Sequence, residues 1–274
     1  MYPARVSAEE AFVRGFHQRD PGATARALAR GRTPDGASSY AHLAAAVPSG
    51  SRTLDLGCGD GYLLERLAAR GHDPARLVGL DVSSHELRAA RARLPTVALL
   101  HARAQDLPLA TASLDAVISH LAWTLMPDLE RIVAELARVL APGGRFVAVV
   151  GGGPKGDDAF AGLLDLARPV AAAAPPTPRL GDRRARTDAG LAALFAPATG
   201  FHPPRVDELT IDLSGTAAAV WDALSPSYEL AHVDPTALAA LRADFLAAAP
   251  QWQRPDGLVA ATMYARLVTA PRCG

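Results

Sequence analysis

One ten-residue stretch decides the fold: Leu54-Asp55-Leu56-Gly57-Cys58-Gly59-Asp60-Gly61-Tyr62-Leu63. An apolar run that begins at Thr53 meets three glycines at alternate positions, and a helix-like segment follows as far as Gly71. The stretch therefore predicts a strand, a tight turn and the start of a helix. Glycine tolerates positive φ and lets a ligand approach the backbone, while free N–H groups at a helix start favour polar or anionic groups. We therefore expect a ligand at this turn.

A second apolar run, Leu77 to Leu80, ends at an acidic residue, Asp81. A dinucleotide-binding fingerprint has an acidic residue about 20 positions after its glycines, so Asp81 stands where that fingerprint would mark a ribose. The fingerprint also has its third glycine one position after Gly61, where this chain has Tyr62. An NAD-dependent oxidoreductase is therefore a weaker interpretation of the turn.

The spacing Gly57-x-Gly59-x-Gly61 follows Asp55, and Asp81 ends the next strand. This arrangement resembles the class I S-adenosylmethionine-dependent methyltransferases. Later segments resemble the adenine-binding segment, the fourth strand and the turn into the fifth strand of that family. They are, in the same order, Gln105-Asp106-Leu107-Pro108, Leu114 to Ser119, and Leu140-Ala141-Pro142-Gly143-Gly144-Arg145-Phe146. The resemblance covers roughly Tyr40 to Gly151 and implies S-adenosylmethionine as the cofactor. It says almost nothing about the acceptor.

Strand-like segments alternate with helix-like segments through this region, which indicates βαβ units and a parallel sheet. With the resemblance, the pattern predicts an α/β fold: a doubly wound, mostly parallel, seven-stranded Rossmann-like sheet with an antiparallel edge strand and a helical lid. The last two strands are expected at Val206 to Leu213 and at Leu258 to Val268.

The resemblance also implies a domain organisation. We expect an N-terminal helical lid over residues 1–36 and a methyltransferase domain over residues 37–274, whose insertions 152–186 and 214–257 form a cap on the acceptor side. Phe12, Phe16 and His17 are candidate lid residues. The alternative for this segment is an ordinary amphipathic helix packed on the core.

Composition limits the classes of partner. Hydrophobic residues make up 49% of the 274, enough for a sizeable core, and 28 basic and 28 acidic side chains cancel to a formal charge of zero. This balance leaves no electrostatic footprint for a nucleic-acid backbone. No long apolar run or secretory signal is visible, and the two cysteines form neither a disulfide framework nor a metal set. We expect a cytoplasmic monomer or homodimer that acts on a small-molecule substrate, with no metal, nucleic acid or membrane.

The resemblance assigns the cofactor contacts to residues near the strand ends. Asp81 is expected to accept hydrogen bonds from both ribose hydroxyls, because an ionised carboxylate has two free oxygens. Asp106 is expected to accept from the adenine amine, and Asp55 to order the loop or a bridging water. Cys58 is expected to act through its amide. The expected cofactor-binding residues are Tyr40, Asp55, Gly57, Cys58, Gly59, Asp81, Val82, Ala104, Gln105, Asp106 and Ser119.

Substrate chemistry is expected after the fourth strand, because open α/β folds place catalytic groups at the carboxyl ends of strands. His120 stands there, and a pKa of about 6.5 suits a general base near neutral pH. The alternative is a histidine bonded to backbone in the lid or core. Trp123, Trp221 and Tyr228 are expected to bind the substrate or cover the sulfonium, with ordinary packing as the alternative for each.

These features favour a methyltransferase that acts on a small molecule in bacterial specialised metabolism. Two other interpretations stay open. One is an enzyme that cyclises the aminobutyryl chain of S-adenosylmethionine to an azetidine amino acid and releases methylthioadenosine. The other is a non-catalytic or regulatory protein that binds S-adenosylmethionine. The sequence does not identify the acceptor, nor whether oxygen, nitrogen or carbon is methylated.

Overall fold

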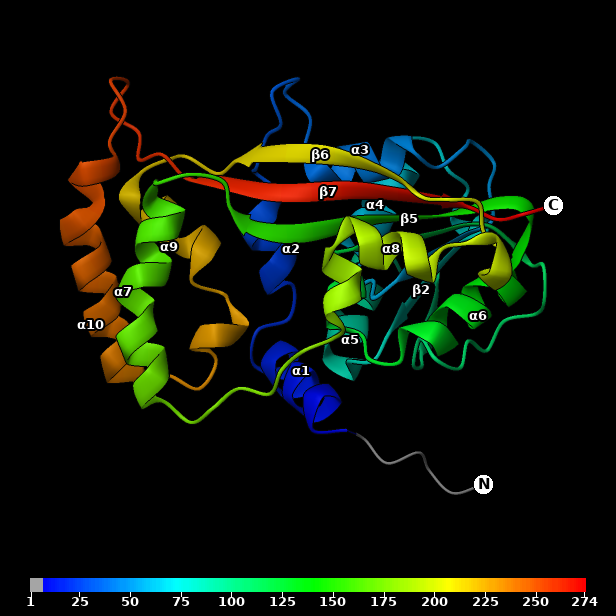
Figure 1. Cartoon of the computed structure of the whole chain (residues 1–274), viewed down its shortest axis with the longest axis horizontal. Helices are drawn as coiled ribbons and strands as arrows, with labels where there is room; N and C mark the ends of the chain where they lie inside the picture. Colours follow the sequence, from blue (N-terminus) through cyan, green and yellow to red (C-terminus); the bar gives the residue numbers. More distant parts are fainter. Residues whose placement is uncertain (1–6) are drawn as a thin grey trace.

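A computed structural model describes residues 7–274 and contains a seven-stranded sheet in the order β3-β2-β1-β4-β5-β7-β6 (Figure 1). Neighbouring strands from β3 to β5 run parallel, whereas β7 runs antiparallel to both β5 and β6. The predicted doubly wound, mostly parallel sheet is therefore confirmed. The strands are β1 (Thr53–Leu56), β2 (Leu77–Asp81), β3 (Ala98–His101), β4 (Leu114–His120), β5 (Leu140–Pro154), β6 (Arg205–Asp212) and β7 (Thr262–Pro271).

Helices cover both faces of this sheet. Those of residues 7–274 are α1 (Ala8–Arg19), α2 (Ala23–Leu28), α3 (Ser39–Ala45), α4 (Tyr62–Ala69), α5 (Ser84–Arg93), α6 (Leu129–Val139), α7 (Ala159–Ala173), α8 (Asp188–Leu194), α9 (Ala217–Leu224) and α10 (Pro235–Ala248). Residues 1–6 of the expected lid lie outside the described residues. No helix within residues 7–274 combines the length and apolar character that a membrane crossing needs.

Alternation along β5 shows how the sheet builds a core on each face. Val147 and Val149 belong to one buried cluster, while Phe146, Ala148 and Val150 belong to the other. Successive side chains of a strand point to opposite faces, so this pattern is that of a strand buried on both sides. The first cluster includes residues of α3, α4, α7, α9 and α10, and the second includes residues of α6 and α8.

The sequence at the start of α5 has Ser83 and Glu86 at the spacing of a capping box, but only half of that box forms. Ser83 caps the helix as expected, since its Oγ accepts the N–H of Glu86 at 3.4 Å. The reciprocal half of the capping box does not form, because the N–H of Ser83 donates to Asp81 Oδ1 at 2.8 Å. The Glu86 carboxylate instead accepts the N–H of Gly22, in the turn between α1 and α2. The turn between α1 and α2 therefore lies over the start of α5. A local sequence pattern cannot predict this contact between distant segments.

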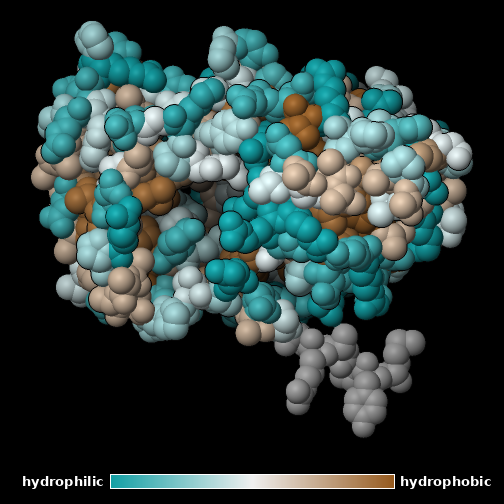
Figure 2. All heavy atoms as spheres, viewed as in Figure 1, coloured by the Kyte–Doolittle hydropathy of each residue, from teal (hydrophilic) through white to brown (hydrophobic). Residues whose placement is uncertain are grey.

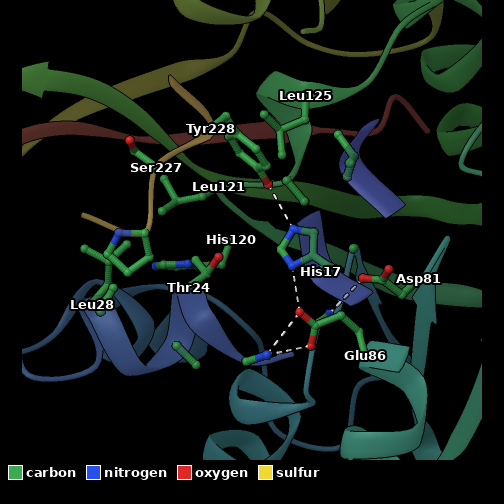
Figure 3. A pocket seen from close by; sticks show the side chains of 18 of the residues that line it. His17, Thr24, Leu28, Asp81, Glu86, His120, Leu121, Leu125, Ser227 and Tyr228 are labelled. Carbon is green, nitrogen blue, oxygen red and sulfur yellow. Dashed lines mark hydrogen bonds and ion pairs between the residues drawn. The ribbon is translucent and has the colours of Figure 1, made fainter. Parts of the chain in front are cut away.

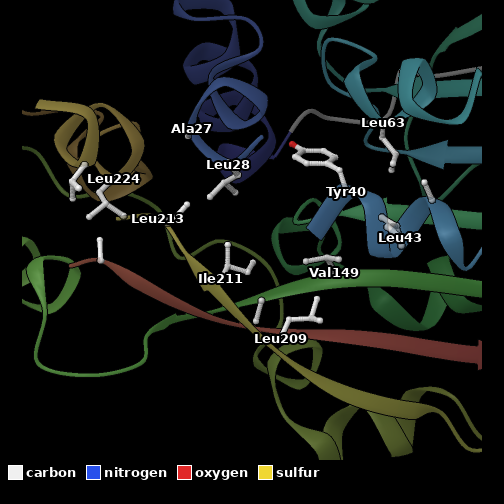
Figure 4. Close-up of a cluster of buried hydrophobic side chains, with 14 of the residues drawn as sticks. Ala27, Leu28, Tyr40, Leu43, Leu63, Val149, Leu209, Ile211, Leu213 and Leu224 are labelled. Atoms are coloured by element: carbon white, nitrogen blue, oxygen red, sulfur yellow. The ribbon is translucent and has the colours of Figure 1, made fainter. Parts of the chain in front are cut away.

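Helices α7, α9 and α10 gather at one end of the sheet (Figure 1). Aromatic rings pack between these helices. The ring centroids of Trp221 and Trp252 lie 5.7 and 5.8 Å from that of Phe245. The fit is close, because a Cβ added at Gly162 of α7 would lie 1.9 Å from Trp252. Nearby, α2 covers a cluster that includes Leu28, Leu213 and Leu224 (Figure 4). Helices α7, α9 and α10 are therefore tightly packed and share one buried cluster with α3 and α4.

Candidate active site

A cavity of about 440 Å³ lies at the carboxyl ends of the parallel strands. Its volume is within the range of about 300–1,000 Å³ that small-molecule sites occupy. The wall combines the glycine turn, the ends of β2 and β4, and residues of α1, α2, α7, α9 and the short helix η5 (Tyr228–Leu230). Figure 2 shows the surface hollowed near the middle of the molecule, between the α7–α10 end and the rest of the sheet. Ligands of open α/β folds bind at this edge.

The glycine turn after β1 needs glycine at its first position. Gly57 has a φ of +76°, and a Cβ there would lie 2.3 Å from the Cβ of Ala122. The first three amides of the turn are not free. The N–H groups of Gly57 and Cys58 donate to the Leu80 carbonyl at 2.8 and 3.0 Å. That of Gly59 donates to Asp81 Oδ2 at 2.9 Å.

These amides are occupied because β2 runs directly beside β1 and ends against the turn. The amides of Gly57, Cys58 and Gly59 are therefore not available to an anion. The turn brings backbone close to the cavity while these donors stay satisfied. Cys58 is buried, and burial raises the pKa of its thiol well above the usual value, so the thiol is held neutral.

Two carboxyls lie at the turn, the half-buried Asp81 and the buried Asp55. Asp81 accepts the N–H groups of Ser83 and Gly59, and burial raises its pKa despite them. Asp55 is buried and its Oδ2 has no hydrogen-bond partner, and burial raises its pKa well above the usual range. An orphaned buried carboxyl of this kind is costly unless a ligand pairs with it. The turn therefore fits a ligand that carries a positive charge.

The cavity wall contains most of the residues expected to bind the cofactor. They are Tyr40, Asp55, Gly57, Cys58, Gly59, Asp81, Val82, Ala104 and Gln105. Asp106 is not among them, because its side chain is 57% exposed and pairs with Arg131 of α6. Ser119 is also outside the wall, since it is fully buried and its hydroxyl donates to the Leu56 carbonyl at 2.8 Å. We therefore leave Asp106 and Ser119 out of the candidate site.

His120 lies in the wall at the end of β4. Its ring stacks on that of Tyr40, with 3.7 Å between the ring centroids and an interplanar angle of 16°. Its Nε2 lies 2.9 Å from the Ser39 hydroxyl. Nδ1 is buried without a partner, and burial lowers the pKa of His120 to about 3. The imidazole is therefore neutral at physiological pH. Leu121, next in the chain, has a φ of +60°, a strained value that persists only where surrounding structure imposes it.

Helix α1 crosses the cavity and is held on two sides. Near its start, Glu10 Oε2 lies 2.9 Å from Arg103 Nε. Near its end, His17 Nδ1 lies 2.7 Å from Glu86 Oε1, and His17 Nε2 lies 2.9 Å from the Tyr228 hydroxyl (Figure 3). Sequence reasoning missed Glu86, because its place in a capping-box pattern explained it without a long-range partner.

The three aromatic residues expected to bind the substrate are separated by the fold. Tyr228 lies in the cavity wall. Trp123 is fully buried in the cluster that includes residues of α6 and α8, and its ring centroid lies 5.1 Å from that of Phe146. Trp221 packs on Phe245. Neither tryptophan lines the cavity, because each fills a core, and we leave both out of the candidate site. The sequence carried no signal for the apolar residues that do line it, such as Phe160, Leu163 and Met263.

Residues 54–148 match the family model described as a methyltransferase domain. The chain contains a class I S-adenosylmethionine-dependent methyltransferase domain. A methyltransferase of Mycobacterium tuberculosis, described as uncharacterized, is 44% identical over 94 residues, which are 34% of this chain and 37% of that protein. A fatty-acid O-methyltransferase of Mycolicibacterium smegmatis is 37% identical over 110 residues, 39% of this chain and 40% of the relative. The matches thus span less than half of these relatives.

Solved structures share the fold over more of the chain. A protein of Anaeromyxobacter dehalogenans assigned as a type II methyltransferase superposes with a TM-score of 0.60 and 24% identity, covering 89% of this chain and 97% of the other. The methyltransferase fold therefore includes both the matched segment and most of the residues that follow it.

The residues around the cavity fit the cofactor of this family. S-adenosylmethionine carries a positively charged sulfonium, a positively charged ammonium group and one carboxylate, so the molecule is a cation overall. Within residues 7–274, the wall holds seven carboxyl side chains, and its one arginine is already paired with Glu10. The unpartnered oxygen of Asp55 adds an acceptor that only a ligand is left to satisfy. The excess of carboxyl groups in the cavity wall therefore favours this cationic cofactor.

Proposed function

We propose that the chain is a methyltransferase that uses S-adenosylmethionine and a small-molecule acceptor. One observation carries this: a single cavity joins the carboxyls of the glycine turn to His120 and an apolar wall formed by α2, α7 and α9. Donor and acceptor sites in one cavity favour transfer between two small molecules. Positioning of the two reactants supplies most of the rate in such a reaction.

Each residue of the site has a proposed task. Asp81 is proposed to accept the ribose hydroxyls with the lone pairs that its two backbone hydrogen bonds leave free. Asp55 is proposed to face the ammonium group, and the backbone at Ala104 and Gln105 to contact the adenine. When bound, S-adenosylmethionine supplies an activated methyl group. His120 is proposed to contact the acceptor as a neutral imidazole whose ring Ser39 and Tyr40 hold. The predicted role as general base is not kept, because a pKa of about 3 makes this imidazole too weak a base near neutral pH.

We further propose that α1 and α2 form a lid and that residues 152–186 and 214–257 form a cap. Contacts of Glu10 and His17 with the methyltransferase domain, and of His17 with Tyr228, support this division. A closed lid excludes water from the reacting groups. A cavity of about 440 Å³ suits a small acceptor better than a polymer. Specialised metabolism and a cytoplasmic location stay predictions.

Mass spectrometry of the nucleoside products tests the proposal. The purified chain is incubated with S-adenosylmethionine, first alone and then with a pooled extract of small metabolites. S-adenosylhomocysteine that forms only with the extract is the expected result, and a metabolite heavier by one methyl group identifies the acceptor. Methylthioadenosine formed without an acceptor overturns the proposal in favour of cyclisation, and binding without any product indicates a non-catalytic protein. Asp81→Ala is the inactive control.

A further inference from the structure

Strands β5 and β7 lie side by side (Figure 1), and their pairing becomes irregular where they reach the cavity. The register shifts between Gly151 and Gly153, so Gly152 is an extra residue on β5. Such a β-bulge re-aims the side chains around it, and bulges are frequent next to active sites. Gly153 of β5 and Met263 of β7 both line the cavity, so the bulge forms part of its wall.

Two glycines of the bulge are needed for different reasons. A Cβ at Gly152 would lie 2.2 Å from an aromatic ring of β7, so the bulge itself requires glycine there. A Cβ at Gly151 would lie 3.0 Å from Met263 Cε and 3.3 Å from Leu121 Cδ2. Both of these side chains line the cavity. Gly151 therefore makes room for Met263 in the wall.

Helix α7, which follows the bulge in the chain, lines the cavity with one apolar stripe. Its members recur at helical spacing, and they are Phe160, Leu163, Leu164 and Ala167. Met263 packs against the buried cluster that contains Leu163. Within residues 7–274, every side chain that α7 and β7 contribute to the wall is therefore apolar.

The polar side chains of the wall belong to other elements. Thr24 belongs to α2, His120 to the end of β4, and Ser227 and Tyr228 to the start of η5. The seven carboxyl side chains belong to α1, β1, the glycine turn, β2, α5 and η5. A molecule that fills the cavity therefore meets polar groups on these elements and only apolar side chains on α7 and β7.

We propose that Met263 determines acceptor specificity by packing, together with the α7 stripe, against an apolar group of the acceptor. The inference rests on the proposed function and adds a substrate class, small molecules that carry an alkyl or aryl group. Methionine is unbranched and polarizable, so it fills irregular gaps and is frequent at surfaces that bind varied ligands. Because Gly151 has no Cβ, the methyl group of Met263 lies where an alanine would crowd it.

Calorimetric titration of the full chain with neutral probes of graded length tests the inference. The chain is saturated with S-adenosylhomocysteine and then titrated with benzamide, 4-ethylbenzamide and 4-butylbenzamide, which share one polar end. Burial of one methylene raises affinity by up to about 4-fold, so we expect the butyl probe to bind at least about 5-fold more tightly than benzamide. A smaller gain, or no binding of the butyl probe, overturns the inference. A chain that does not bind S-adenosylhomocysteine fails as a methyltransferase before any probe is added, whereas one that binds it without the gain keeps the proposed function and loses the inference.

Matched substitutions at two methionines of the wall locate the gain in affinity from benzamide to the butyl probe. Met263→Gln places a polar group of similar size on the apolar face and should reduce the gain at least about 3-fold, whereas Met263→Leu should retain it. Met126→Gln is the control, because Met126 lines the cavity at the glycine turn, where its Cε would lie 3.5 Å from a Cβ at Gly57. This control should leave the gain unchanged. An undiminished gain in Met263→Gln, or equal losses in the two glutamine variants, contradicts the role of Met263.

Gly151→Ala gives a second variant, in which Met263 itself is unchanged. The added Cβ would crowd the Met263 methyl group at 3.0 Å and push it toward the cavity. We expect this variant to bind the butyl probe several-fold more weakly than the wild type while its affinity for benzamide changes less. Binding of S-adenosylhomocysteine shows that each variant is folded. A gain in folded Gly151→Ala equal to that of the wild type contradicts the inference.

Discussion

His17 Nδ1 lies 2.7 Å from Glu86 Oε1, although 69 residues separate the two in the chain. The same carboxylate accepts the N–H of Gly22 at 3.1 and 3.0 Å, and the other ring nitrogen of His17 lies 2.9 Å from the hydroxyl of Tyr228. Glu86 therefore joins α5 of the methyltransferase domain to the α1–α2 turn, and His17 extends this connection to η5. These contacts hold α1 against the cavity.

Glu86→Ala is expected to loosen α1. The change leaves the buried N–H of Gly22 without an acceptor, at a cost of about 1–3 kcal/mol. Limited proteolysis should cut the chain faster between α1 and α2, and S-adenosylhomocysteine should protect it less. Glu86→Gln keeps an acceptor for the N–H of Gly22, so its cleavage rate should lie between those of the wild type and Glu86→Ala. A cleavage rate of Glu86→Ala equal to that of the wild type would contradict the role of this carboxylate.

Asp81→Asn should weaken cofactor binding by about 10- to 100-fold, because hydrogen bonds to a charged acceptor contribute about 1.5–3 kcal/mol. Asp106→Asn should change the affinity by less than about 3-fold, since this residue is exposed and lies outside the cavity wall. Titration of both variants with S-adenosylhomocysteine measures the two effects. A large loss for Asp106→Asn would restore the sequence-based assignment of this residue to the adenine.

Cofactor binding should be linked to proton release at Asp55. Burial raises the pKa of this carboxyl well above its usual range, which favours the neutral form in the free protein. A bound cation lowers that pKa, so a proton leaves on binding and the affinity falls as the pH is lowered. Calorimetry in buffers of different ionisation enthalpy counts the released protons. Asp55→Asn should remove the linkage, and an unchanged proton count in this variant would refute it.

His120 should make the fold sensitive to acid. Its pKa is held at about 3 by burial, so below about pH 6.5 the unfolded chain binds a proton there that the folded chain does not. The free energy of unfolding should therefore fall by about 2 kcal/mol more in the wild type than in His120→Asn between about pH 7.5 and about pH 5. Urea unfolding at both pH values gives this difference. Parallel pH dependence in the two proteins would mean that the ring is protonated in the folded state.

Trp123→Ala should destabilise the fold without emptying the binding site. Loss of this fully buried ring leaves a cavity between Phe146 and Phe195, at a cost of about 3–5 kcal/mol. Chemical unfolding measures the loss, and affinity for S-adenosylhomocysteine below the transition should stay near the wild-type value. Tyr228→Phe, which removes only a hydroxyl, should cost about 0.5–1.5 kcal/mol. Lost affinity in folded Trp123→Ala would return this residue to the binding site.

Local patterns predicted the central strands and helices of the fold well. The turn from β1 into α4, the carboxyl at the end of β2 and the buried β4 follow from glycine positions and apolar runs. Side-chain direction was harder to predict. Asp106 turns toward Arg131 and Trp123 turns into the core behind β4, although each stands in a segment that borders the cavity. A small change in the backbone conformation of a loop redirects a side chain from the cavity to another surface. The spacing of residues in the sequence does not contain this information.

The sequence by itself determined the sheet and the glycine turn, because these depend on short-range periodicity and on positive φ at Gly57. The cofactor was implied by the resemblance of the sequence to a known family. Only the tertiary structure decided that the amides of the turn are occupied, that Asp55 lacks a partner and that Glu86 holds α1. Each of these depends on which groups far apart in the chain meet in the folded protein. Burial then determines whether such a group is ionised, paired or left free for a ligand.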